Sequence, residues 1–328
     1  MSRKSTFGVD GEALIASVCV AGEPATQART NTARARLLER IVAAITAQQG
    51  ETGRHADAVL LPGGYFYLPE RIEAADFATR RAALEAAPFA ADCREAAEKL
   101  PEGTYLVVGI DGARRQSTLL DQWCVAWTLE GVAGLGRKIF PTDAEAEQLV
   151  VYESDFAARE RGITLVSGQR ALLCACYDMF GVSEPYQANR ARMAKIKHIG
   201  GPAEHSSAGT PRFDARCDAA LLRWQDLIED GGFTVGLAAI HSFPRSGAGS
   251  GRGMWQRHGV ATCSAALHGG LAVGASHFER LPASERTTLA ARKVPRRHLG
   301  EAQRRKALEK APLWTASLPG KALIRWFA

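Results

Sequence analysis

This chain of 328 residues lacks the sequence signatures of a disulfide-rich, zinc-binding or membrane protein. Its seven cysteines are an odd number and include no Cys-x-x-Cys pair, which argues against both a disulfide framework and a zinc knuckle. No group of His, Cys, Asp and Glu has metal-ligand spacing, and no run approaches the ~20 apolar residues of a membrane helix. We therefore expect a cytoplasmic protein with no metal, no cofactor and no membrane span.

A strong charge of one sign is also missing from the main body of the chain. The net charge is +6, but the segment from Arg286 to the end contributes +9, which leaves −3 for the rest. This basic segment has few aromatic side chains to stack on bases, so we favour a solvated or partner-packed tail over a nucleic-acid-binding arm. The predicted organisation is one domain over 1–284 and a basic C-terminal tail over 285–328, with an amphipathic helix over 301–310.

Two glycine-rich segments lack the spacing of phosphate-binding loops. GVAGLG over 131–136 is not the Gly-x-Gly-x-x-Gly of a dinucleotide site, and SGAGSGRG over 246–253 has no Gly-Lys-Ser/Thr. We interpret both segments as turns and loops, and the WQRH sequence over 255–258 as the start of a helix.

Short apolar runs alternate with helical stretches over most of the chain. Apolar runs that stop at Gly, Pro, Asp or Ser indicate strands, and apolar residues three or four apart indicate helices. The predicted strands are 14–20, 58–61, 105–110, 122–128, 137–140, 163–166, 170–176, 233–241 and 271–278. The predicted helices are 37–45, 80–86, 93–100, 221–229 and 260–267. Hairpins within this alternation favour an α/β protein with two mixed sheets, each covered by helices.

Cys176 is distinguished by the place where its strand ends. The sequence RALLCACYDMFG puts it last in an apolar run, directly before a break. A thiol at such a corner is open to attack a substrate, and the backbone N–H groups of Tyr177 and Asp178 follow it to bind an oxyanion. The alternative is a small buried hydrophobic residue, as we expect for Cys174.

The segments around this cysteine resemble the nitrilase superfamily of carbon–nitrogen hydrolases. GQRALLCACYD is similar to the family's nucleophile motif, GLGRKIFPT to the segment with its catalytic lysine, and VVYESDF to the stretch with its second glutamate. The resemblance implies that Cys176 is the nucleophile, that Lys138 stabilises the oxyanion and that Glu153 orients Lys138. Lys138 and Glu153 precede Cys176 by 38 and 23 residues, as the family's spacing requires.

The resemblance covers roughly positions 12–280 and departs from the family at one catalytic position. It implies a four-layer αββα sandwich of the nitrilase type, paired as a homodimer or larger homo-oligomer. ADAVLLPGGYFYL resembles the strand and turn of the first catalytic glutamate, but Gly63 stands in that position. That glutamate normally takes the thiol proton and later activates water. We hypothesise that an anionic group of the substrate fills the space beside Gly63 and pairs with Lys138.

The implied activity is thiol-dependent hydrolysis or acyl transfer at an amide, nitrile or carbamoyl C–N bond of a small molecule. Asp178 is interpreted as a turn or capping residue, and His241 as either a pocket residue or a structural histidine. The alternative function is a nitrilase-like scaffold that has lost catalysis and binds a small ligand or a partner protein. The residues expected to line the substrate pocket are Gly63, Tyr65, Tyr177, Asp178 and His241.

Overall fold

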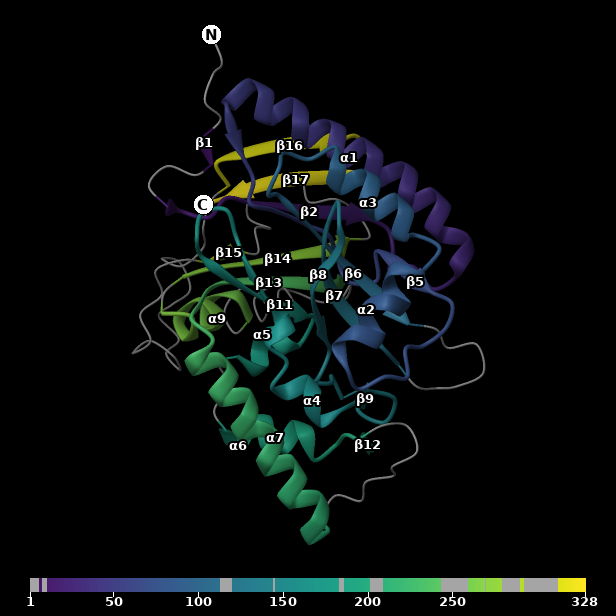
Figure 1. The fold of residues 1–328 in the computed structure, drawn as a ribbon, viewed down its shortest axis with the longest axis vertical. Helices are drawn as coiled ribbons and strands as arrows, with labels where there is room; N and C mark the ends of the chain where they lie inside the picture. Colours follow the sequence, from purple (N-terminus) through teal and green to yellow (C-terminus); the bar gives the residue numbers. More distant parts are fainter. Residues whose placement is uncertain are drawn as a thin grey trace.

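The strands of the protein form a long sheet that divides into two halves, as the computed structural model shows (Figure 1). The structure describes residues 6–7, 11–112, 120–143, 145–182, 186–200, 209–242, 259–268, 270–278, 290–291 and 312–328. Along its main path the order of strands is β10 (Gly162–Thr164), β11 (Arg170–Ala175), β13 (Phe233–Ser242), β14 (Leu271–Phe278), β2 (Ile15–Ala21), β4 (Ala58–Leu60), β6 (Tyr105–Gly112), β7 (Gln122–Thr128) and β8 (Gly131–Arg137).

Shorter strands extend this path or pair apart from it. On the main sheet, β5 (Phe66–Leu68) pairs with β6, β15 (Ala290–Ala291) with β14, and β17 (Ala322–Phe327) with both β2 and β16 (Trp314–Leu318). Two separate pairs are β1 (Thr6–Phe7) with β3 (Arg54–His55) and β9 (Val150–Val151) with β12 (His198–Ile199).

The helices are distributed along the whole chain between these strands. They are α1 (Asn31–Thr52), α2 (Phe77–Glu85), α3 (Ala90–Glu98), α4 (Glu153–Phe156), α5 (Asp178–Gly181), α6 (Tyr186–Met193), α7 (Pro211–Asp230) and α9 (Ala261–Ala266), with 3-10 turns η2 (Ala28–Thr30) and η3 (Arg159–Arg161). The long helix α7 begins at an N-capping Thr210 followed by Pro211, and α1 ends at Gly53 in the left-handed conformation. No helix among the described residues is long and apolar enough to cross a membrane.

The two halves of the sheet separate along β2. Its first residues, Ile15–Ser17, pair with β4, whereas only its last two, Val20 and Ala21, pair with β14. The half that contains β10, β11, β13 and β14 therefore turns away from the half that contains β4, β6, β7 and β8, and the two pack face to face.

Three apolar clusters show that the result has four layers. The cluster between the sheet halves includes Ile15, Leu60, Leu173 and Leu237. A second cluster packs α1, α2 and α3 on the outer face of one half, and a third packs α5, α6, α7 and α9 on the outer face of the other. Figure 1 shows α1 and α3 on the opposite side of the sheets from α5, α7 and α9. The predicted αββα sandwich is confirmed.

The segment GVAGLG is strand β8, so its interpretation as a turn was wrong, and the hairpin partner of β7 is Gly131–Arg137 rather than 137–140. Its glycines are explained by the packing of the sheets. A β-carbon on Gly134 would lie 2.7 Å from Cγ2 of Ile163, and one on Gly136 would lie 2.5 Å from the carbonyl oxygen of Leu173. Glycine is therefore needed where β8 crosses close to β10 and β11.

The end of the chain belongs to the sheet, although the sequence indicated a tail over 285–328. Every residue of β17 is buried, and β17 runs antiparallel to β2 from Ala322 to Phe327. Ile324 and Trp326 of β17 pack into the cluster beneath α1. β17 therefore covers β2 and completes this part of the core. The predicted segments over 246–253, 255–258 and 301–310 lie outside the described residues.

Shortening one side chain of β17 tests whether this strand supports the core. We expect Ile324→Ala to lower the free energy of unfolding by about 2–5 kcal/mol, because Ile324 is fully buried and its loss leaves a cavity. Leu222→Ala, on the exposed side of α7, is the control and should change it by about 0.5 kcal/mol or less. Denaturant unfolding of both variants measures the difference. Equal effects would place β17 outside the cooperative core.

Candidate active site

Cys176 leaves β11 in a conformation that side chains rarely adopt. Its φ is +49°, in the left-handed region, which costs about 1–3 kcal/mol and persists only where the surroundings impose it. Its N–H donates to the carbonyl oxygen of Ala239 at 2.9 Å, so the end of β11 stays attached to β13. The residue is buried, with an exposed fraction of 7%.

Lys138 comes to this thiol from the other half of the sandwich. It follows β8 directly, its N–H donates to the carbonyl oxygen of Gln122, and its side chain is fully buried. Asp178, two residues after Cys176, connects the two segments. One oxygen of its carboxylate accepts from the N–H groups of Ile139 and Phe140 at 2.8 and 3.0 Å. Asp178 is thus a buried structural clamp and not a pocket residue.

Glu145, which the sequence analysis did not single out, is the carboxylate that holds Lys138. The distance between Lys138 Nζ and Glu145 Oε2 is 2.6 Å. The same oxygen accepts from the N–H and hydroxyl of Thr142, while Oε1 accepts from the side-chain amide of Gln122. These contacts hold the pKa of Glu145 far below its usual range despite burial, with Lys138 as the main stabilising charge. Glu145 therefore stays ionised and orients the ammonium.

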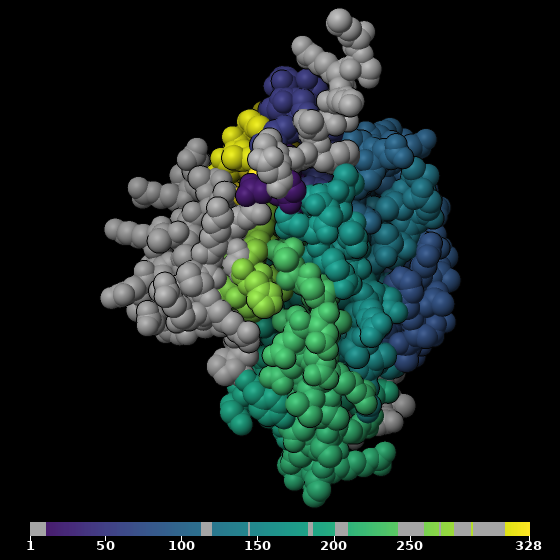
Figure 2. Space-filling view, turned by 60° about the vertical axis from the view of Figure 1, so that its left-hand side comes forward, coloured from purple at the N-terminus to yellow at the C-terminus, as the bar shows by residue number. Residues whose placement is uncertain are grey.

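Glu153 is not the partner of Lys138, which corrects the role inferred from the family resemblance. Its carboxylate lies 2.9 Å from Nε of Arg216 and 3.4 Å from Nη1 of Arg223, both on α7. Glu153 begins the short helix α4, and its ion pairs direct it to α7, the helix that projects at the lower end of the molecule (Figure 2).

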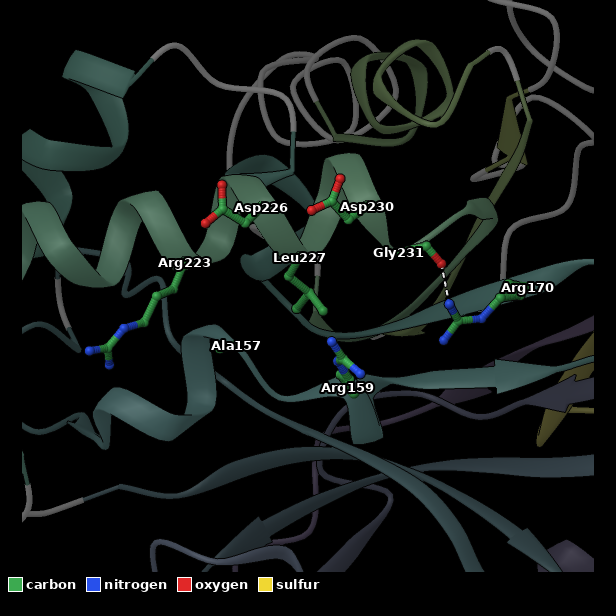
Figure 3. A pocket seen from close by; sticks show the side chains of 8 residues that line it. All are labelled: Ala157, Arg159, Arg170, Arg223, Asp226, Leu227, Asp230 and Gly231. Atoms are coloured by element: carbon green, nitrogen blue, oxygen red, sulfur yellow. Dashed lines mark hydrogen bonds between the residues drawn. The ribbon is translucent and has the colours of Figure 1, made fainter.

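A surface hollow of about 470 Å³ lies beside the C-terminal end of α7, and its lining residues include no nucleophile. In Figure 3, Arg223 and Leu227 extend from α7 on one side and Arg159 lies across from them, while Arg170 donates to the carbonyl oxygen of Gly231. None of its lining residues takes part in the contacts around Cys176. We therefore place the chemistry at Cys176 and not here.

His241 and Asp111 occupy the space next to the thiol. The distance between His241 Nε2 and Asp111 Oδ1 is 2.6 Å, and the imidazole also interacts with Cys176. A β-carbon on Gly63 would lie 2.8 Å from His241 Nδ1, and one on Gly64 would lie 2.8 Å from Asp111 Oδ2. The two glycines thus leave room for these side chains. The hypothesis that a substrate anion fills an empty space beside Gly63 is wrong, because His241 fills it.

The remaining predicted pocket residues lie at different places. Tyr65 is fully buried in the cluster beneath α1, and its hydroxyl donates to the carbonyl oxygen of Arg34, so it does not face the thiol. Tyr177 stacks on Phe180 with ring centroids 4.4 Å apart, and the guanidinium of Arg192 lies over its ring. Tyr177 is partly exposed beside the nucleophile turn, where a substrate can reach it.

The charges around Cys176 favour its thiolate. Burial by itself would raise the pKa of Cys176, but Lys138 and then His241 outweigh burial and lower it, although Glu145 opposes them. In contrast, burial raises the pKa of the neighbouring Cys174 and of Cys124 and Cys263, because Arg161 does not outweigh burial at the first two and no cation among the described residues acts on the third. Cys176 therefore differs from these thiols in its chemistry as well as its position.

Asp111 lies outside the recognised motifs, and Glu145 lies in the loop between two of them, GLGRKIFPT and VVYESDF. Asp111 does carry a signal, since it follows the apolar stretch YLVVGI directly and so lies at the end of a strand. Glu145 lies in an acidic loop with no regular pattern. Within the described parts of the chain, no three His, Cys, Asp or Glu side chains are gathered closely enough to hold a metal ion.

No protein-family model and no curated protein matches this chain. Among solved structures it is similar to an amidase from Nesterenkonia sp., of the nitrilase superfamily, with 14% identity, a TM-score of 0.46, and 97% of this chain and 91% of that chain covered. It is similar to a carbon-nitrogen hydrolase from Helicobacter pylori G27 (12% identity, TM-score 0.44, 96% and 89% covered). It is also similar to the C. elegans NitFhit protein (12% identity, TM-score 0.48, 96% and 60% covered).

Alkylation tests the charge environment of the thiol. We expect iodoacetamide at pH 7.5 to modify Cys176 before the other cysteines, because its lowered pKa gives it the larger thiolate fraction. Lys138→Met removes the main cation, so the pKa should rise and alkylation at this pH should slow by about tenfold per pKa unit, with the difference vanishing at high pH. Peptide mass mapping against time gives the rates. Equal labelling of Cys176 and Cys174 would contradict the assignment.

Proposed function

We propose that this protein is a thiol-dependent enzyme that acts on the C–N bond of a small amide, nitrile or carbamoyl compound, by hydrolysis or acyl transfer. The observation that supports this most directly is the convergence on Cys176 of two cationic side chains, the buried Lys138 that follows β8 and the partly buried His241 of β13. A cysteine that served only as a buried hydrophobic residue would not need either charge, since burial of a charge without a partner is costly.

The arrangement supports a nucleophilic first step. The Cys176 thiolate attacks the carbonyl or nitrile carbon, and the developing negative charge on oxygen or nitrogen is stabilised by the Lys138 ammonium. Glu145 holds Lys138 in place without neutralising its effect, because the ammonium has three donors and uses only one on Glu145. Lys138 needs no reorganisation during the reaction, since Gln122 accepts its N–H and Asp178 accepts the N–H groups of the next two residues.

The competing function is a scaffold that binds a ligand or partner without turnover. The scaffold function is suggested by Gly63, which stands in place of the glutamate that takes the thiol proton in the resembled motif. The site geometry favours the enzyme, since a scaffold has no use for a thiolate beside an ammonium. Small substrates fit the enclosed position of Cys176 better than a protein substrate would.

A panel of small acyl donors tests the proposal. We expect at least one aliphatic amide, nitrile or carbamoyl compound to acylate Cys176, seen as a mass increase of the intact protein, with release of amine or ammonia. Lys138→Met should lower kcat by about 10²–10³-fold, because one oxyanion donor is lost. Cys176→Ala should give no adduct.

Lys99→Met is the matched control, since the exposed Lys99 side chain directly after α3 pairs with the exposed Glu95 and its loss should leave turnover unchanged. A parent protein that forms no adduct and shows no turnover across the panel would support the binding scaffold instead.

A further inference from the structure

We propose that His241, held by Asp111, is the group that exchanges protons with Cys176, standing where the resembled family has its first glutamate. This inference rests on the proposed function, since it assigns the base and acid of the same site. In this assignment, the imidazole of His241 at the end of β13 takes the role that a carboxylate on the turn after β4 has in the resembled family.

The position of the imidazole follows from the pairing of the strands. β11 and β13 are parallel neighbours, with Ala175 opposite Ala239, so Cys176 and His241 both lie just beyond paired residues at the carboxyl ends of their strands. Side chains alternate along β13: Ala239 packs between the sheets and Ile240 packs on the outer face. The register of β13 against β14 shifts between Ala239 and Ser242, so the direction of His241 is given by its contact with Asp111, which lies on β6 in the facing half of the sandwich.

The turn at Gly63 and Gly64 makes this placement possible. The N–H of Gly63 donates to the carbonyl oxygen of Ile240 at 3.0 Å, so the turn lies directly against the end of β13. Any side chain at position 63 would meet the His241 ring, with 2.8 Å to Nδ1 and 2.9 Å to Cε1. A glutamate at position 63 and the observed position of His241 are mutually exclusive, so one group has taken the other's place.

Asp111 gives the histidine a fixed orientation. It lies at the end of β6, in the facing half of the sandwich, and its carboxylate accepts from His241 Nε2. Nδ1 is then the ring nitrogen left to face the thiol, since it makes no hydrogen bond to the described residues and His241 is the ring that interacts with Cys176. A carboxylate, an imidazole and a thiol in this sequence of contacts form a relay in which the acid orients the ring and stabilises its charged form.

The groups that face His241 decide its protonation. Asp111 and the Cys176 thiolate are the adjacent anions, Glu145 is a more distant one, and the buried His277 is the neighbouring ring. Burial alone would lower the pKa of His241, but Asp111 and then Cys176 outweigh it and raise the pKa to about 10. These interactions favour a thiolate paired with an imidazolium in the resting site, with Lys138 beside them.

The chemical steps balance with this starting state. For an amide, the thiolate sulfur bonds to the carbonyl carbon, and the imidazolium gives its Nδ1 proton to the leaving nitrogen as the C–N bond breaks. The products are a thioester on Cys176, a free amine and a neutral imidazole. Water then attacks the thioester while His241 accepts a proton from it, and the C–S bond breaks to restore the thiolate, the imidazolium and a carboxylic acid.

The thioester itself prepares His241 for the second step. Formation of the thioester removes the thiolate charge, one of the two adjacent anions that keep the proton on the ring. The pKa of His241 then falls, which makes the ring a base when water must be activated. A single histidine can thus act as an acid first and a base second. It takes both roles in a site where Gly63 stands in the place of the family's glutamate.

Two measurements on the same variants test the proposal. The variants are His241→Gln, Asp111→Asn and the control His268→Gln, an exposed histidine after α9. The first measurement is the pH dependence of Cys176 alkylation by iodoacetamide, which needs no substrate. The second is the single-turnover rate of amine release from an amide that the parent accepts. Thermal unfolding establishes that each variant is folded. If His241→Gln does not fold, Asp111→Asn provides the test instead.

We expect His241→Gln to move the alkylation midpoint to higher pH, because one cation next to the thiolate is lost. Amine release should fall by about 10²–10⁴-fold, as for loss of a general acid, and the decline of the parent's rate near pH 10 should disappear. Asp111→Asn should act in the same direction, and His268→Gln should match the parent. A histidine that merely filled the space would be replaced by glutamine without these changes.

Failure of this inference differs from failure of the proposed function. If the parent turns over and His241→Gln keeps its rate within threefold and its alkaline decline, then His241 is not the proton-transfer group, although the enzyme stands. If the parent acts on no acyl donor, the proposed function fails. An unmoved alkylation midpoint in His241→Gln would then overturn the pairing of His241 with Cys176 as well.

Discussion

The carboxylate of Asp178 is the contact on which the geometry of the site depends. It is fully buried, pairs with Arg161 at 2.9 Å and accepts the N–H groups of Ile139 and Phe140, while Arg161 also donates to the carbonyl oxygen of Arg137. The nucleophile turn belongs to one half of the sandwich and the segment of Lys138 to the other. Removal of one partner of a buried ion pair typically costs about 3–5 kcal/mol, so this contact joins the halves firmly where the chemistry is placed.

Glycines set the second constraint, which is how closely the backbone segments approach. Gly134 and Gly136 bring β8 against the facing strands, and a side chain on Gly109 would strike the turn at Gly63. The absence of side chains at the Gly63 turn leaves space beside it, and His241 of β13 occupies that space. The same short spacing places Asp111 within hydrogen-bond distance of the imidazole. The glycines at these positions therefore explain both the close packing of the backbone segments and the presence of His241 and Asp111 in the site.

Local patterns were sufficient for most of the fold and for part of the site. Apolar runs ending at polar residues located β2, β6, β11, β13 and β14, because burial on both faces needs such runs. They failed for β8, whose glycines resemble a loop, and for β17, whose strand is short and lies in a basic region. Glu153 was chosen by its motif, but salt bridges depend on how the loops fold, and Glu145 reaches Lys138 instead.

The sequence by itself determined an α/β protein with mixed, helix-covered sheets and the place of Cys176 at the end of a strand, because both follow from the period of apolar residues along the chain. The αββα sandwich was implied by the resemblance of its motifs to the nitrilase superfamily. The sequence also indicated Lys138 through the motif around it. Only the tertiary structure decided which groups surround the thiol. His241, Asp111 and Glu145 come from segments separated by up to 130 residues, and their meeting depends on parallel strand ends, on the two glycines of one turn and on a buried clamp. Such contacts leave no periodic pattern in a single sequence.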